Sequence, residues 1–286
     1  MALTGVRRVI PLTFGWEHIP LSISILGGDP HRRLREPVPG VLCEVDGGWI
    51  LLDAGFNTPA LCDPEIGPTY AFDYVDDELV GDDGDCVEVA FERVGVDPDD
   101  VVAVAVSHLH YDHAGGLHRF ADRVPVHCQQ RELEAATVSG DDEPPSGCRT
   151  LDYQGLGADW RLADGDVELA PGITAVATYG HTAGHQSFVV DLADGGGFVF
   201  AFDAADLQKN LDEELSPGGL YTGDDHSDAA VERVAEEAIE AIRRLKAIAA
   251  EKGYRLLPGH DPDVWPAFTA DLAVPGADGP TRMVTW

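Results

Sequence analysis

Positive charge is scarce in this 286-residue chain, which carries 19 lysine and arginine residues against 51 aspartate and glutamate residues, a formal net charge of −32. Only Lys209, Lys246 and Lys252 are lysines. Such a surface repels phosphate backbones and anionic lipid, so nucleic acid and membranes are not expected as partners. High-GC coding bias or salt adaptation also favours aspartate over lysine, and we prefer that explanation to functional tuning of the charge.

Paired cysteines and long apolar segments are missing too. The five cysteines are scattered and none belongs to a Cys-x-x-Cys pair, at positions Cys43, Cys62, Cys86, Cys128 and Cys148. A disulfide framework or a thiolate zinc site is therefore not expected, and a reducing cytoplasm is the predicted location. No apolar run approaches the length of a membrane span, and the N-terminus has no apolar segment followed by a small-residue cleavage site.

Short apolar runs are present throughout the chain, and turn-forming residues separate them. Runs of this kind are typical of buried strands, which are predicted within residues 6–15, 41–55, 101–107, 172–180, 187–206 and 254–261. Helical spacing predicts helices at residues 86–94, 131–137 and 228–252, with Gly95 and Gly253 at the ends of the first and last. The pattern favours an α/β fold in which helices cover a β-sheet core.

No repeat, low-complexity segment or linker divides the chain, so one domain over residues 1–286 is predicted. Four prolines between positions 262 and 280 predict an irregular tail over residues 263–286. A long loop is predicted over residues 138–160. The acidic, turn-rich stretch 60–85 contains three aromatic residues, and it could be a lid, a dimer contact or an inert loop.

Three histidines and one aspartate lie within six positions in the segment SHLHYDHAGG, residues 107–116, directly after an apolar run. Histidine nitrogen and carboxylate oxygen are ligands for zinc and similar divalent ions. His108 and His110 can turn towards one ion, and Asp112 and His113 can serve a second ion close by. Four donors cannot complete two metal sites, so further ligands must come from other loops.

Three other donors also follow apolar runs. His181 comes after the run at 173–178, Asp203 ends the run FVFAFD, and His260 ends RLLPGH. If these runs are strands, four loops bring their donors to one edge of the sheet core.

The motifs HLHYDHAGG, GHTAGHQS, AFDAAD and LLPGHD, in this order, resemble those of the metallo-β-lactamase superfamily. The longer segments around them are similar to its N-acyl-homoserine lactonase branch, the quorum-quenching lactonases. The resemblance covers roughly residues 38–262, which we take as the core of the domain. It implies an αββα sandwich, in which two β-sheets pack together and helices lie on the outer faces.

The resemblance also implies a dinuclear metal site. His108, His110 and His181 would bind the first ion, and a second set would bind the other ion, namely Asp112, His113 and His260. Asp203 would bridge the two ions. The ions are expected to be Zn²⁺, with iron, manganese and cobalt left open, and a homodimer is possible in this family.

The activity that follows is hydrolysis of a lactone ring, with N-acyl-homoserine lactones as the expected substrates. A hydroxide bridging the two ions would attack the ester carbonyl, and Asp112 could pass a proton to the leaving alkoxide. Hydrolysis of another lactone, ester or thioester on the same site is the main alternative. Phosphodiester cleavage conflicts with the net charge of −32, and a non-catalytic binding protein would not be expected to keep all seven ligands.

Asp206 departs from the family pattern, because well-known lactonases of this branch have a tyrosine there that contacts the lactone carbonyl. An ionised aspartate cannot donate a hydrogen bond, so either another group replaces the tyrosine or the substrate differs. Tyr111 is expected to line the pocket as a catalytic residue, and Tyr221 is a further candidate. Asp53 is predicted either to orient ligand histidines or to form a strand-end turn, and His185 is predicted either to support a ligand side chain or to be structural.

Overall fold

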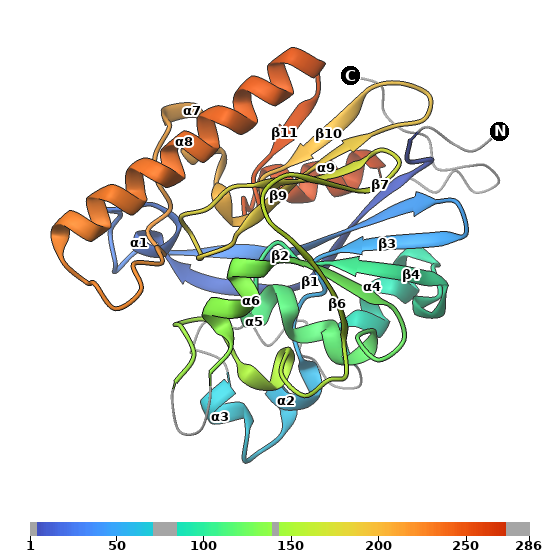
Figure 1. The fold of residues 1–286 in the computed structure, drawn as a ribbon, viewed down its shortest axis with the longest axis horizontal. Coiled ribbons are helices and arrows are strands. Elements are labelled where there is room, and N and C mark those ends of the chain that lie inside the picture. Colours follow the sequence, from blue (N-terminus) through green and yellow to red (C-terminus); the bar gives the residue numbers. More distant parts are fainter. Residues whose placement is uncertain (1–4, 71–84, 139–142, 273–286) are drawn as a thin grey trace.

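The structure, a computed structural model, describes residues 5–70, 85–138 and 143–272. Two β-sheets pack face to face, and helices cover the outer side of each sheet (Figure 1). The first sheet has the strand order β1-β2-β3-β4-β5-β6, with bounds Val9–Pro20, Arg33–Val45, Gly48–Leu52, Val101–Ala105, Pro125–Gln129 and Asp159–Ala163. The second has the order β11-β10-β9-β8-β7; in chain order, β7 to β11 are Val167–Ala170, Ile173–Ala177, Gln186–Asp191, Gly197–Phe200 and Arg255–Leu257. This arrangement confirms the αββα sandwich.

The central strands of the first sheet, β3 and β4, are buried on both faces, which explains why they read as continuous apolar runs. In β2, Val41 and Cys43 face the second sheet, where they pack with Phe188 and Phe200. Leu42 lies between them in the strand and faces the outer helices instead. Side chains that alternate between two apolar layers fix the register, because a slip of one residue would exchange the two faces.

The helices flank the sheets, with bounds α1 Leu21–Ser24, α2 Thr58–Cys62, α3 Gly67–Tyr70, α4 Cys86–Val94, α5 Tyr111–Ala114, α6 Gln130–Ala136, α7 Gln208–Glu213, α8 Asp228–Lys252 and α9 Val264–Leu272. Short 3₁₀ turns occur at η1 Pro98–Asp100, η2 Gly115–Arg119, η3 Thr150–Asp152 and η4 Phe202–Ala204. Helix α8 packs Ile242 and Leu245 on the second sheet (Figure 1). Gly95 and Gly253 end α4 and α8 in the left-handed conformation, as their positions predict.

The prediction of an irregular tail over residues 263–286 is wrong for its first part, which forms α9. Pro266 lies in the first turn of this helix, where the missing backbone N–H has no intrahelical partner to lose. The apolar face of α9 is buried: Phe268 packs on Phe198, with ring centroids 5.3 Å apart, and Trp265 Nε1 donates to the Leu12 carbonyl. Residues 273–286 lie outside the described part of the chain.

Strands β5, β6 and β7 carry too weak a pattern to be predicted. Strand β6 is an edge strand whose residues are largely exposed, so it has no apolar face to read. The loop predicted over 138–160 contains η3 and the first residues of β6. In the stretch 60–85, the structure describes the end of α2 and all of α3, where Tyr70 is buried. The rest of this stretch, for which the sequence leaves a lid, a dimer contact and an inert loop open, lies mostly in residues 71–84, outside the described ranges.

Several strands end at the same edge of the sandwich. Strands β3 and β4 are parallel neighbours, with Leu52 opposite Ala105, and β10 and β11 are parallel neighbours, with Phe200 opposite Leu257. The loops after these strands therefore leave the sheets together, next to the loop after β8. In residues 5–70, 85–138 and 143–272, no helix is both long enough and apolar enough to cross a membrane.

Candidate metal centre

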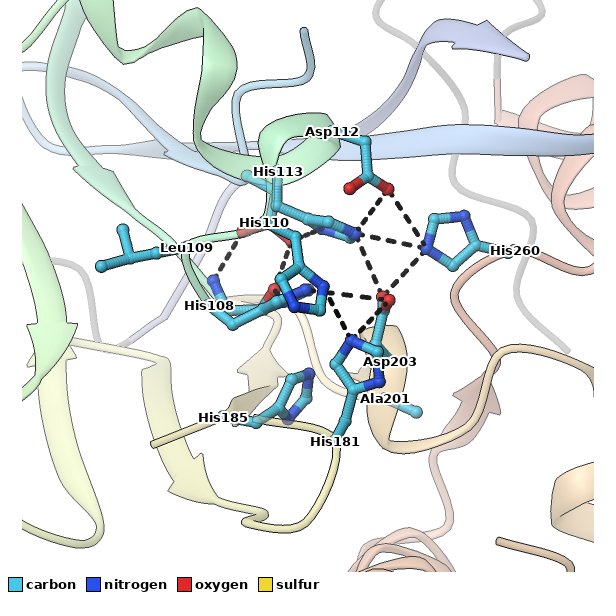
Figure 2. A network of polar contacts seen from close by, with 12 residues as sticks. His108, Leu109, His110, Asp112, His113, His181, His185, Ala201, Asp203 and His260 are labelled. Carbon is cyan, nitrogen blue, oxygen red and sulfur yellow. Dashed lines mark hydrogen bonds and ion pairs between the residues drawn. The ribbon is translucent and has the colours of Figure 1, made fainter. Parts of the chain in front are cut away.

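Seven side chains from four loops meet at this edge and form two groups with metal-ligand spacing (Figure 2). Within each group, one ligand atom per residue lies within 4.8 Å of the others. The first group contains His108, His110, His181 and Asp203, and the second contains Asp112, His113 and His260. The structure thus brings together all seven residues that the sequence motifs single out. Each is buried, apart from the half-buried His110.

Asp203 lies between the two groups and offers one oxygen to each (Figure 2). Its Oδ2 is 3.3 Å from His181 Nε2 in the first group. Its Oδ1 is 2.9 Å from His260 Nε2 and 3.2 Å from His113 Nε2 in the second. A carboxylate placed in this way can be shared by two ions, because each oxygen has lone pairs directed to a different group.

Hydrogen bonds on the outer nitrogens direct three histidines towards the centre. His113 Nδ1 donates to Asp53 Oδ2 at 2.7 Å, and His260 Nδ1 donates to the Pro37 carbonyl at 2.9 Å. Ser107 Oγ donates to Asp53, so it accepts from His108 Nδ1. In each ring Nε2 is left with its lone pair facing the cluster. Histidines that bind metals in proteins are commonly held in this way.

Asp53 performs both functions considered for it. It directly follows β3 with a φ of +57°, the positive value of a sharp strand-end turn. Its fully buried carboxylate accepts from His113 and from the backbone and side chain of Ser107. The turn is what brings this carboxylate under the ligand loop.

The electrostatics of the cluster fit positive ions. Burial lowers the pKa of His110 to about 4 and that of His181 to about 3, so both imidazoles are neutral and can donate a lone pair to a metal. Burial alone would raise the pKa of Asp203, yet the surrounding histidines, His113 and His260 foremost, hold it well below its usual range. The carboxylates in turn raise the pKa of His113 and His260 against the effect of burial. Neutral His110 and His181 and the ionised carboxylates form a donor set that suits divalent cations, which would take the place of the protons on His113 and His260.

His185 lies beside the first group and outside it, as expected from the motif (Figure 2). It is fully buried, and its Nδ1 is 2.9 Å from Thr178 Oγ1. Its ring centroid is 5.2 Å from that of His108. His185 therefore packs behind a ligand histidine and helps to fix the position of that ring.

Glu132 in α6 is a site residue that the sequence reading missed. Its Oε1 accepts from the Leu109 backbone N–H at 3.0 Å, and its Oε2 accepts from the Gly184 N–H at 2.7 Å. It therefore ties the loop that carries His108 and His110 to the loop that carries His181. The sequence does contain a signal for this role. Glu132 is four residues before Ala136, so both lie on the same face of the predicted helix, and a charged residue on a buried face is unusual.

We expect Glu132→Gln to weaken metal binding by about tenfold, the lower end of the effect of losing a side chain that orients metal ligands. Glutamine can accept from one backbone N–H, but its amide NH₂ would face the other as a second donor. Titration against a chromophoric chelator measures the affinity. Glu134→Gln, an exposed change on the same helix, is the matched control and should leave the affinity unchanged. Equal affinities in the two variants would contradict the role of Glu132.

A cavity of about 750 Å³ opens over the cluster. Its walls include five of the seven cluster residues, and also Asp206, Tyr111 and Tyr221. The Tyr111 ring is buried against Phe56, and its hydroxyl donates to Glu17. The side chain of Asp206 is buried, and its Oδ1 has no hydrogen-bond partner. Burial and the charge of Asp203 raise the pKa of Asp206 well above its ordinary value.

Comparison with known proteins places this site in a family. The family model described as metallo-beta-lactamase superfamily matches residues 35–260. The N-acyl homoserine lactonase AttM of Azorhizobium caulinodans is 30% identical over 238 residues, which cover 81% of this chain and 84% of that protein. The N-acyl homoserine lactonase AiiA of Bacillus thuringiensis subsp. kurstaki is 28% identical over 234 residues, with the same coverage of both chains.

Solved structures agree with the sequence relatives. A quorum-quenching N-acyl homoserine lactone hydrolase has a TM-score of 0.72 at 25% identity, covering 92% of this chain and 94% of its own. An N-acyl homoserine lactone hydrolase with the product N-hexanoyl-L-homoserine bound at the catalytic metal centre has a TM-score of 0.71 at 26% identity, with coverages of 92% and 95%. The chain therefore belongs to the metallo-β-lactamase superfamily, within its N-acyl homoserine lactonase branch.

Proposed function

We propose that this protein is a metal-dependent lactonase that hydrolyses the ring ester of N-acyl homoserine lactones. The observation that carries the proposal is Asp203, which joins two complete ligand groups beneath a cavity. The relatives in the same branch act on these lactones, and one solved relative holds the ring-opened product at its metal centre. One ion would be bound by His108, His110 and His181, and the other by Asp112, His113 and His260. Asp203 would be shared by both ions.

Two divalent ions held there would lower the pKa of a water molecule and polarise the ester carbonyl. The chain supplies the remaining functions. Asp112 lines the cavity, so its carboxylate can take up the proton that the attacking water loses and pass it to the leaving alkoxide. Cys148 also lines the cavity, but burial raises the pKa of its thiol, which disfavours the nucleophilic thiolate.

We propose that Tyr111 supports the cavity wall and does not contact the reacting ester. Its hydroxyl donates a hydrogen bond to Glu17 and its ring is buried, so the side chain is held in place. Tyr221 also lines the cavity and is available for contact with substrate. Tyr221 and Asp206 are therefore the two candidates for the contact with the lactone carbonyl that the tyrosine makes in other members of the branch. Asp206 is also the residue that favours the second candidate function, hydrolysis of a different lactone or ester at the same site.

We propose zinc as the metal, since imidazole nitrogen and carboxylate oxygen suit it, although iron, manganese and cobalt accept the same donors. Metal analysis of the purified protein distinguishes them. We also propose a cytoplasmic location, which is supported by the four buried cysteines Cys43, Cys86, Cys128 and Cys148, all of them free thiols.

The test is ring opening, followed by proton release, across short- and long-chain N-acyl homoserine lactones and simple γ- and δ-lactones. Metal-loaded protein should open the acyl homoserine lactones, and the Asp203→Ala variant should not. Opening only of the simple lactones would move the protein to a different lactonase. No turnover of any lactone by the metal-loaded protein would overturn the proposal.

A further inference from the structure

Four buried carboxyl groups that belong to neither ligand group line the cavity. Glu132 accepts from two backbone N–H groups, and we call the other three the acidic wall: Glu17, Glu36 and Asp206. Glu17 and Glu36 are opposite each other in the antiparallel pairing of β1 and β2. Asp206 follows the loop of Asp203, and its backbone carbonyl accepts from the His260 N–H at 2.8 Å. The acidic wall therefore adjoins the ligand cluster on the His260 side.

The protein provides little to satisfy these carboxyl groups. Glu17 accepts from the Tyr111 hydroxyl, and Glu36 accepts from Ser24 Oγ at 2.7 Å. Asp206 is only 3% exposed, and its Oδ1 has no partner at all. Within the described ranges, none of the three forms an ion pair with a lysine or arginine, and neither residue type lines the cavity.

Burying carboxylates without a positive partner is costly, so an unpaired group of three calls for an explanation. Packing does not require acids here, because apolar residues of similar size would fill the same wall at lower cost. Two divalent ions in the neighbouring cluster would offset part of this charge, but none of the three acids belongs to their ligand groups. A positively charged group that enters the cavity would satisfy all three directly.

Resting on the proposed lactonase function, we propose that the acidic wall is a subsite for a cationic part of the substrate, an ammonium group on a short acyl chain of an N-acyl homoserine lactone. An ammonium has three N–H donors and no acceptor, so it can be shared among several carboxylates. A third metal ion fits less well, because these three side chains do not form a ligand group of the kind seen in the cluster. A single amide N–H would leave most of the acceptors unsatisfied.

Two substrate pairs of matched shape test the proposal. N-glycyl homoserine lactone differs from the N-propanoyl compound only in an ammonium that replaces a terminal methyl group, and N-β-alanyl differs from N-butanoyl in the same way. At pH 7 both amines are largely protonated. We expect kcat/KM to be about tenfold to a hundredfold higher for the cationic member of at least one pair, the range of a desolvated charge pair.

Variants of the acidic wall show whether it causes this preference. Glu17→Gln, Glu36→Gln and Asp206→Asn should each move the cationic-to-neutral ratio towards one. Because the ratio is taken within one variant, a general loss of activity cancels. Glu168→Gln removes one charge from an exposed position on β7, and its ratio should equal that of the parent protein.

A binding measurement gives a second readout that does not depend on turnover. Calorimetric titration with the N-glycyl and N-propanoyl derivatives of the corresponding lactam, which is not ring-opened, should show tighter binding of the cation to the parent protein alone. Equal kcat/KM within both pairs, or a ratio that all three variants leave unchanged, would overturn the subsite. Failure to open any of the four lactones would instead count against the lactonase function itself.

Discussion

Replacing Asp203 with alanine is expected to lower kcat/KM for lactone opening by about a thousandfold or more, since ligand loss removes both charge stabilisation and the geometry of the site. Asp203 is the residue that contacts both ligand groups, with oxygens 2.9 Å from His260 Nε2 and 3.3 Å from His181 Nε2. Without it, two separate groups of three ligands remain and nothing fixes the spacing between the ions. Bound metal should fall from two ions per chain towards one.

Elemental analysis after exhaustive dialysis, together with initial rates of proton release, measures both effects. Asp194→Ala makes the same substitution at an exposed residue in the turn between β9 and β10, and it should keep both ions and full activity. The parent protein treated with a chelator provides the metal-free reference. An Asp203→Ala variant that retained two ions and the parent rate would show that the two groups do not share this carboxylate.

The positions of the seven clustered residues could be predicted from the sequence because each lies in a short motif beside a recognisable strand. His108, His110, Asp112 and His113 are consecutive donors after β4, and the other ligands follow β8, β10 and β11. Once the apolar runs are read as strands, the strand ends bring the donors together. No long-range contact has to be known in advance.

Apart from Asp53, which ends a predicted strand, the residues that support and surround the cluster could not be predicted in the same way. Glu132 acts on two loops that are far apart in the sequence, through backbone N–H groups that carry no sequence signal. Glu17 and Glu36 meet only through the register of β1 and β2, and in the sequence they look like ordinary surface acids. Their roles depend on tertiary contacts, which local patterns do not encode.

The second large effect is on stability and concerns α9, a helix that the sequence does not predict because prolines lie in and around it. We expect Phe268→Ala to reduce the free energy of unfolding by about 3–5 kcal/mol, the usual cost of deleting a buried phenylalanine ring. Phe268 is fully buried and packs on Phe198 and Phe200 of the second sheet. Denaturant unfolding of metal-loaded protein measures the loss. Leu162→Ala, in an edge strand where Leu162 is 47% exposed, should cost less than about 1 kcal/mol.

The position of α9 also connects this stability to the metal centre. Asp261, next to the ligand His260, accepts from the Val264 N–H at 2.8 Å through Oδ1 and from the Gln208 N–H at 2.9 Å through Oδ2. Loosening α9 should therefore disturb the His260 loop before the rest of the cluster. We expect Phe268→Ala to lose one of its two ions more readily than the parent protein during dialysis, while Leu162→Ala retains both. A small change in unfolding free energy with unaltered metal content would mean that α9 supports neither the core nor the site.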